Sequence, residues 1–390
     1  MPARRAPQYL YTHPTCGPFL RLGTCAFDDP FPPKWSASVL FICKPFITAP
    51  QPPALAYIDV DGEHSITGRI IDSFADYNFW RFDIALPLSP AQRRIKYWVS
   101  LSPACGVPPA WEFFLPGSRQ TWRWAAYSCS GFSLRADPEE WGGNDQPLWG
   151  DLVRRHRASP IHALVGGGDQ LYNDEVFRTP LVREWAALRS RGARQGAPFT
   201  EYMREEVEAF YFGHYCGHFM GGGMREALAT IPSVMLWDDH DIFDGWGSYP
   251  DDLLRCPVLE GIYQAACKFY LLFQQHVTAG MVERGESDLF GGPQPSAGCP
   301  HRAHCFVKML GADVALVGAD TRAERSMKQV MREETWDAVC GRIRNLPASV
   351  RHVVVLFTVP VVFPKVLLES VGLSFPVCFG ACAARGTHLM

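Results

Sequence analysis

Apolar and polar positions follow one pattern up to about residue 118 and a different pattern after it. In the first part, short apolar runs rich in aromatic and β-branched residues alternate with turn residues such as Asp61 and Gly62. This alternation predicts strands over 54–62, 65–71, 79–86 and 95–100. We therefore expect residues 1–118 to form a small all-β module.

From residue 119 onward, short apolar runs alternate with longer segments of helical periodicity. The pattern predicts strands over 161–165, 231–237, 313–318 and 353–357, and helices over 148–156, 181–191, 199–219, 257–281 and 325–344. Strands that are apolar throughout and alternate with helices are typical of a sheet covered by helices. The expected fold class is α/β, with a layered sheet core over residues 119–364.

The composition is that of a folded protein without a strong charge bias. The 390 residues are enough for two or three domains, and 47% of them are hydrophobic. The net charge of -3 argues against a nucleic-acid partner.

Nothing in the sequence predicts a secretion signal or a membrane span. The most apolar stretch, 353–384, is interrupted by Pro360, Pro364 and Lys365, so it lacks the run of about 18 apolar residues that a membrane helix needs. The 13 cysteines are odd in number and irregularly spaced, which favours reduced thiols over a disulfide framework. We therefore expect a cytoplasmic protein.

Three of the predicted strands are followed by acidic segments. These are Gly168-Asp-Gln-Leu-Tyr-Asn-Asp174, Asp238-Asp-His-Asp-Ile-Phe-Asp244 and Asp320-Thr-Arg-Ala-Glu-Arg325. Binding sites of open α/β sheets lie outside the carboxyl ends of their strands. Asp169 could bridge two metal ions, and Tyr172 could bind one as a phenolate. Hard oxygen ligands are offered by Asp238, Asp239 and Asp244, and His240 is a nitrogen ligand or proton donor.

A simpler interpretation exists for any one of these segments, because an aspartate at a strand end is often only a helix cap or turn former. Four aspartates and a histidine within 238–244 are different, since closely packed carboxylates repel unless a cation or proton relieves them. We therefore favour a metal site. Two ions ~3.5–4 Å apart would clamp a phosphate and activate a water, as a metal-bound hydroxide, for in-line attack.

Two of the segments resemble the PhoD-like phosphatases, the alkaline phosphatase D family of metallophosphoesterases, and most closely its fungal and oomycete branch. They are Gly168-Asp-Gln-Leu-Tyr-Asn-Asp174 and Trp237-Asp-Asp-His-Asp-Ile-Phe-Asp-Gly-Trp-Gly-Ser-Tyr249. Supporting segments occur in the family's order: Tyr127-Ser-Cys-Ser-Gly-Phe132, Asp320-Thr-Arg-Ala-Glu-Arg325 and Val359-Pro-Val-Val-Phe-Pro364.

The resemblance implies a metallophosphoesterase domain that hydrolyses phosphate mono- or diesters with a mixed centre of iron and calcium. It implies roles for Cys129 as a thiolate ligand of the iron, Asp169 as the bridging carboxylate, Tyr172 as the iron phenolate and Asp238 as a ligand of the second metal. It further implies that His240 contacts the phosphate or protonates the leaving group. The family often has Asn shortly after the Asp-His-Asp segment, where this chain has Asp244 and Gly245.

Two arginines of the third acidic segment are candidates for substrate binding. Arg322 and Arg325 could bind phosphate oxygens through their planar forks. Ion pairs with Asp320 or Glu324 are an equally good interpretation of the two arginines.

The sequence departs from the family after Pro364. The family has a later Gly-Asp-Val-His segment, whose Asp and His complete the metal site, and no such tetrapeptide occurs in this sequence. We therefore expect an incomplete phosphatase domain, truncated or altered, with an atypical tail over 365–390. The alternative function that follows is a catalytically inactive protein that binds a phosphate ligand or a partner.

Two further groups resemble zinc ligands only superficially. His214 and His218 stand four residues apart, as zinc ligands on a helix do, but the aromatic residues around them favour core packing. Cys299 and Cys305 bracket two histidines at a spacing that matches no common zinc finger, which favours a polar loop.

Overall fold

The computed structural model describes residues 11–27, 33–45, 52–101, 107–132, 137, 140, 147–292 and 300–360. Its strands are β1 (Thr15–Leu22), β2 (Lys34–Cys43), β3 (Ala54–Asp59), β4 (Gly62–Thr67), β5 (Arg69–Phe74), β6 (Tyr77–Pro87), β7 (Arg93–Ser100), β8 (Trp111–Leu115), β9 (Trp124–Tyr127), β10 (Ala163–Gly166), β11 (Ser233–Met235), β12 (Phe306–Met309), β13 (Val314–Gly318) and β14 (His352–Leu356).

The helices occupy most of the chain between β9 and β12. They are α1 (Pro147–Ala158), the 3-10 helix η4 (Asn173–Arg178), α2 (Pro180–Ala186), α3 (Arg191–Gly196), α4 (Glu201–Phe219), α5 (Gly222–Thr230), α6 (Asp239–Ile242), α7 (Asp251–Leu254), α8 (Pro257–Tyr270), the π-helix η5 (Leu271–Gln275) and α9 (Ala279–Glu283), with α10 (Glu333–Arg344) following β13.

The main sheet has seven strands in the order β5-β6-β2-β1-β11-β10-β9. Strands β5, β6, β2 and β1 pair antiparallel, whereas β1, β11, β10 and β9 pair parallel. Arg21 of β1 pairs with Ser233 of β11, which joins the two halves. Strands from before and after residue 118 therefore lie in one continuous sheet, although the division of the chain at that point stays a prediction.

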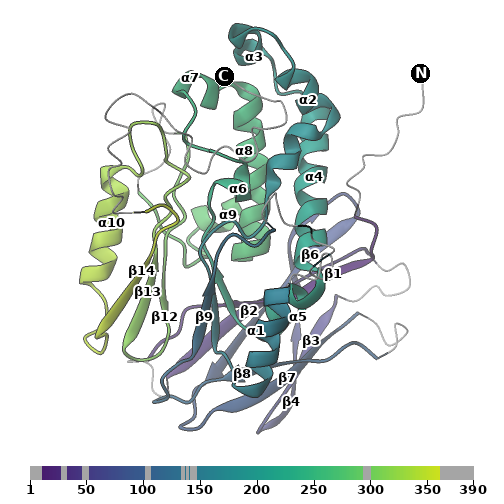
Figure 1. Cartoon of the computed structure of the whole chain (residues 1–390). Coiled ribbons are helices and arrows are strands. Elements are labelled where there is room, and N and C mark those ends of the chain that lie inside the picture. The colour runs from purple at the N-terminus through teal and green to yellow at the C-terminus, as the bar shows by residue number, and fades with distance from the viewer. Residues whose placement is uncertain are drawn as a thin grey trace.

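Two smaller sheets flank the main one. Strands β4, β3, β7 and β8 form an antiparallel sheet, and β13 pairs antiparallel with β12 and parallel with β14. Helices α4 and α8 lie side by side, α5 packs against β1 and β8, and α10 flanks the β12–β14 sheet (Figure 1). The predicted class, α/β with a layered sheet core and an all-β N-terminal region, is confirmed.

The buried side chains of the sheet and of the helices form one core. Phe219 of α4 meets Phe19 of β1 with 5.6 Å between ring centroids, and Phe212 meets Phe79 of β6 at 6.0 Å. Burial alternates along much of β6, where Phe82 and Ile84 are buried and Asp83 is exposed, because one face of the strand covers this core. The N-terminal strands therefore support α4, which in turn contacts η4.

Three of the predicted helices are shorter than expected. The segment 181–191 is helical only as far as Ala186, where α2 ends, and α3 begins at Arg191. The segment 257–281 is interrupted at His276, whose φ of 55° is left-handed and ends η5. The segment 325–344 becomes helical only at Glu333, because the Glu324 side chain accepts the backbone N–H of Arg332 at 2.9 Å and holds the preceding residues as a loop. The left-handed backbone of His276 and the side-chain contact of Glu324 thus interrupt the helical periodicity at these two places.

Three sequence predictions concern residues that the structure does not describe. The predicted tail over 365–390, residues 361–364 of the last family segment, and Cys299 all lie outside the described residues. Within the described residues, no helix is long and apolar enough to cross a membrane. The nine cysteines in this part of the chain are free thiols.

Candidate metal centre

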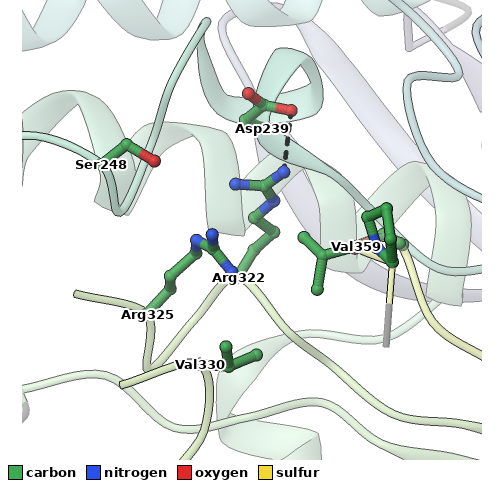
Figure 2. Close-up of a pocket in the computed structure, with 8 residues that line it drawn as sticks. Asp239, Ser248, Arg322, Arg325, Val330 and Val359 are labelled. Atoms are coloured by element: carbon green, nitrogen blue, oxygen red, sulfur yellow. Dashed lines mark ion pairs between the residues drawn. The ribbon is translucent and has the colours of Figure 1, made fainter. Parts of the chain in front are cut away.

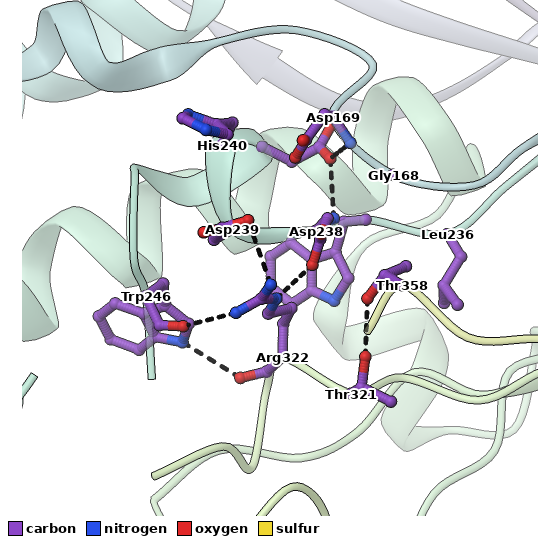
Figure 3. A network of polar contacts seen from close by, with 12 residues as sticks. Gly168, Asp169, Leu236, Asp238, Asp239, His240, Trp246, Thr321, Arg322 and Thr358 are labelled. Carbon is purple, nitrogen blue, oxygen red and sulfur yellow. Dashed lines mark hydrogen bonds and ion pairs between the residues drawn. The ribbon is translucent and has the colours of Figure 1, made fainter. Parts of the chain in front are cut away.

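The loops after three strands meet at one edge of the structure. Strands β10 and β11 are parallel neighbours, so their carboxyl ends lie together and bring Asp169 next to Asp238 and Asp239. The loop after β13 approaches from the smaller sheet and delivers Arg322 to the same place (Figure 3). The convergence expected from the three acidic strand ends is therefore present.

Gly168 allows the first two loops to approach closely. Its φ is 102°, and a Cβ at this position would lie 2.5 Å from the Cβ of Asp238. The next residue, Asp169, also has a positive φ, of 54°. A non-glycine residue in the left-handed region is uncommon and costs about 1–3 kcal/mol when the surrounding structure imposes it.

Asp241 holds the two loops together. Its fully buried carboxylate accepts the backbone N–H of Asp169 at 2.7 Å and that of Asp238 at 2.8 Å on one oxygen, and Nε2 of Gln274 donates to the other oxygen at 2.8 Å. Burial, with the nearby Asp169 charge, raises the pKa of Asp241 well above its usual value. Asp241 therefore positions the site residues from behind.

Asp169, Asp239 and His240 form a group that could hold a metal ion, because their ligand atoms lie within 4.8 Å of one another. Both aspartates are buried. Burial, followed by the charge of Asp238, raises the pKa of Asp169 to about 7. Oδ1 of Asp169 is buried without a hydrogen-bond partner among the described residues. An orphaned carboxylate oxygen beside other carboxylates fits a bound cation.

His240 is held by Asp174. Nδ1 of His240 lies 2.7 Å from Oδ2 of Asp174, and the other Asp174 oxygen accepts the backbone N–H of Asp244 at 2.6 Å. Burial alone would lower the pKa of His240, but the hydrogen bond and charge of Asp174, with the charges of Asp169 and Asp239, raise it to about 9. The carboxylate fixes the ring and leaves Nε2 for the site.

Arg322 pairs with the carboxylates that follow β11. Nε binds Asp238, Nη2 lies 3.2 Å from Oδ1 of Asp239, and Nη1 donates to the carbonyl of Trp246 at 3.0 Å (Figure 3). The side chain of Arg322 thus forms ion pairs with Asp238 and Asp239 rather than with Asp320 or Glu324. Asp238 is engaged with this arginine and lies outside the group of three.

Asp320 and Glu324 have structural partners instead. Asp320 is fully buried and accepts the indole N–H of Trp237 at 2.9 Å and the backbone N–H of His304 at 2.8 Å. Glu324 forms an ion pair with Arg332 at 2.7 Å. Both acids therefore shape the loops after β13, and their partners leave Arg322 available to the site.

Cys129 and Tyr172 flank Asp169. The thiol of Cys129 lies 3.6 Å from Oδ2 of Asp169, on a residue with a φ of 53°. Burial and the charge of Asp169 raise the pKa of both the thiol and the phenol. The Tyr172 ring lies beside that of His240, tilted by 49°, with 4.5 Å between centroids, and a Cβ at Gly131 would come within 2.7 Å of the Tyr172 ring. Both side chains adjoin the group of three without belonging to it.

Asp244 stands on the far side of His240. Its Oδ1 lies 3.9 Å from Nε2 of the imidazole, and burial raises the pKa of its carboxyl group. Like Asp238, it borders the group of three and is not a member of it.

The two histidines of α4 lie among aromatic rings. Nδ1 of His214 is 2.8 Å from Oδ1 of Asn173, and its ring is 5.5 Å from that of Phe210. Burial lowers the pKa of His214 and of His218 to about 4, so both are neutral at physiological pH. They are absent from the metal-ligand group found among the described residues.

Sequence reasoning missed two functional residues, Asp174 and Asp241. Both lie inside the acidic segments already selected, but their side chains contact a ring nitrogen and two backbone amides rather than the open site. For Asp241 the available signal was its position three residues after Asp238, the spacing of a capping box at a helix N-terminus. For Asp174 the sequence offers no comparable signal, because its partner lies 66 residues away.

Comparisons with known proteins identify the family. A sequence profile described as PhoD related phosphatase matches residues 91–378. The chain belongs to this family, which confirms the predicted resemblance. The match begins before the predicted boundary at residue 118 and extends past Pro364, where the resemblance by motif ended.

The match to a yeast relative covers most of this chain but only about half of the relative. The uncharacterized protein YGR266W of the yeast Saccharomyces cerevisiae is 30% identical in an alignment 390 positions long, which covers 90% of this chain and 54% of the yeast protein. The yeast relative agrees with the fungal branch expected from the sequence.

Two solved structures are similar in fold at low identity. "Structure of PhoD" has 13% identity and a TM-score of 0.43, covering 79% of this chain and 52% of that one. The purple acid phosphatase PPD1 from seeds of yellow lupin (Lupinus luteus) has 9% identity and a TM-score of 0.46, covering 88% and 50%. The chain spans about half the length of each of these relatives.

Proposed function

We propose that this chain is a metal-dependent phosphoesterase that hydrolyses phosphate mono- or diesters. The observation that carries the proposal is the convergence of Asp169, Asp239 and His240 within 4.8 Å. Membership of a PhoD-related phosphatase family supports the same chemistry. The convergence favours an enzyme over a catalytically inactive binding protein, because burying an unpartnered carboxylate is costly unless the site uses it.

The donor set fits cations of two kinds. Asp169 and Asp239 are hard oxygen donors suited to calcium, and Cys129 and Tyr172 add a thiol and a phenol on the side of Asp169 that would suit iron. Asp238 and Asp244 are further oxygen donors beside them. Such cations, when bound, would polarise a phosphoryl oxygen and lower the pKa of water.

Arg322 would orient the substrate phosphate. Its fork pairs with Asp238 and Asp239, and the same N–H groups are donors that match phosphate oxygens. A guanidinium held by the carbonyl of Trp246 at 3.0 Å needs little reordering to make that contact.

His240 would supply a proton to the leaving group. The hydrogen bond from Nδ1 to Asp174 fixes the ring so that Nε2 faces the site, and the pKa of His240, which burial lowers but Asp174 raises to about 9, keeps the ring protonated. In this role His240 donates a proton, and Asp169 and Asp239 are the groups that would hold a cation. Asp174 and Asp241 act as positioning residues, since each contacts another site residue rather than the substrate.

The proposal is tested with p-nitrophenyl phosphate and its bis ester. Purified protein loaded with iron and calcium should hydrolyse at least one of them, lose activity on chelation and regain it when the ions are restored. The ratio of the two rates assigns the protein as a mono- or a diesterase. Folded, metal-loaded protein that hydrolyses neither ester would refute the proposal.

A further inference from the structure

A cleft opens beside the metal-ligand group, with which it shares Asp239 (Figure 2). Its volume is about 290 Å³, and it is lined by Asp239, Ser248, Arg322, Arg325, Val330, Thr358, Val359 and Pro360. This volume is at the lower end of small-molecule pockets, which span about 300–1,000 Å³. The cleft therefore suits a compact ligand. Asp239 belongs both to its lining and to the candidate metal centre.

The two arginines of the cleft differ in their partners. Arg322 engages Asp238, Asp239 and a backbone carbonyl. In contrast, Nε and Nη1 of Arg325 are buried without a hydrogen-bond partner among the described residues. Buried N–H groups of a charged side chain are costly when unpaired, and they are the donors that phosphate oxygens match best.

Gly247 fixes the position of Arg325. A Cβ at Gly247 would lie 2.5 Å from Cγ of Arg325 and 2.7 Å from its Cβ, and the glycine has a φ of 86°. The aliphatic stem of the arginine therefore packs directly on the loop that follows α6. This packing orders the guanidinium at the cleft, so binding an anion there costs little conformational entropy.

We propose that Arg325, with Ser248 of the same cleft, binds a second anionic group of the substrate, a phosphate that is not the one hydrolysed. The inference rests on the proposed function and assigns its substrate class: small phosphate esters that carry a further phosphate. One phosphate lies at Asp239 and the metal centre while the other reaches Arg325 in the same cleft. Val330, Val359 and Pro360 offer an apolar wall to the carbon skeleton between them.

Inorganic phosphate and the metal-free protein test the subsite without any turnover. In this state the fork of Arg322 is held by two carboxylates, so phosphate binding depends on Arg325. Calorimetry should give one site, weakened about 10- to 100-fold in Arg325→Met, as expected for losing hydrogen bonds to a charged group. Arg325→Lys, which keeps the charge and loses the fork, should fall between the two.

A matched control shows whether phosphate binding is weakened by losing any positive charge or only by losing Arg325. Arg154 is exposed on α1 and pairs only with Asp151 among the described residues, so Arg154→Met should bind phosphate as the wild type does. Wild-type protein that binds no phosphate, or an Arg325→Met variant that binds it as tightly as the wild type, overturns the inference.

A second arm uses the metal-loaded protein with a hexose bisphosphate and the matching monophosphate. The wild type should prefer the bisphosphate in kcat/KM, and Arg325→Met should reduce that preference at least about 10-fold. Equal preference in the two proteins contradicts the inference. If protein that hydrolyses p-nitrophenyl phosphate hydrolyses neither sugar phosphate, the proposed substrate class is wrong while the proposed function stands, and the phosphate measurement on metal-free protein still decides the role of Arg325.

Discussion

Asp174 holds His240 through a hydrogen bond of 2.7 Å between Oδ2 and Nδ1. The two residues are 66 positions apart in the chain and come from η4, which follows β10, and from α6, which follows β11. A carboxylate behind a histidine fixes both the orientation of the ring and the nitrogen that carries the proton.

Replacing this carboxylate should impair catalysis more than folding. We expect Asp174→Asn to lower kcat/KM for p-nitrophenyl phosphate by about 10- to 100-fold, because His240 loses its charged partner. Steady-state kinetics measure the effect. Asp151→Asn, on the exposed face of α1, serves as the control and should leave kcat/KM unchanged. Full activity in Asp174→Asn would show that the hydrogen bond has no part in catalysis.

Removing Asp241 should loosen both loops of the site. Asp241→Ala leaves the backbone N–H groups of Asp169 and Asp238 and the amide of Gln274 without their acceptor. Unsatisfied buried donors cost about 1–3 kcal/mol each before relaxation, so we expect a loss of roughly 3 kcal/mol in the free energy of unfolding. Urea denaturation measures this loss, and calorimetry should find weaker metal binding. A variant with unchanged stability and metal affinity would contradict the role.

Alanine substitutions at two glycines with similar backbone angles distinguish the cost of backbone strain from the cost of a steric clash. Gly168 and Gly62 have φ values of 102° and 118°, but a Cβ at Gly168 would meet Asp238 at 2.5 Å, whereas Gly62 has nothing within 4 Å. Gly62→Ala should cost only the backbone term of roughly 1–3 kcal/mol. Gly168→Ala should cost more and should also reduce metal affinity. Equal effects of the two substitutions on stability and metal binding would rule out close approach as the reason for Gly168.

Acid stability should depend on Asp288. Its carboxylate binds Lys308 and lies 3.0 Å from Arg21, where both cations are buried. Burial alone would raise the pKa of Asp288, but the charges of Arg21 and Lys308 hold it far below the ordinary value of 3.8. A depressed carboxylate pKa gives stability that is fully present above about 4 and is lost as the pH falls below it.

We therefore expect Asp288→Asn to lose about 3–5 kcal/mol in the free energy of unfolding at pH 7, because two buried cations lose their counter-charge. The variant should also show a flatter fall in stability between about pH 4 and pH 2 than the wild type. Urea denaturation across this range tests both points. Asp252→Asn, in an exposed pair with Arg191, is the matched control and should change little. Parallel pH profiles for wild type and Asp288→Asn would disprove the assignment.

The sequence predicted the edge of the sheet where the site lies, because apolar strands that end in acids are a local pattern. Asp169, Asp239 and His240 all stand in the predicted segments. The partners of these residues could not be predicted, since Arg322 reaches Asp238 from a separate sheet, 84 residues later. Contacts of that range depend on topology rather than on neighbouring residues.

Strand content was likewise easier to predict than sheet membership. Short apolar runs indicate β3, β6 and β7 near their observed positions. The pairing of Arg21 with Ser233, which joins the N-terminal strands to β11, has no signal in the sequence. The end of η5 at His276 was missed for a related reason, because apolar periodicity continues through a residue whose backbone is left-handed.

We propose a phosphoesterase whose Asp169 and neighbouring side chains would hold the cation that its activity needs. The most direct measurement is kcat/KM for p-nitrophenyl phosphate, with metal content per chain, in the wild type and in Asp169→Ala. We predict metal-dependent turnover in the wild type, and loss of both bound metal and turnover, by at least about 100-fold, in the variant. Turnover that persists in Asp169→Ala, or wild-type protein that is folded but binds no metal, would contradict the account.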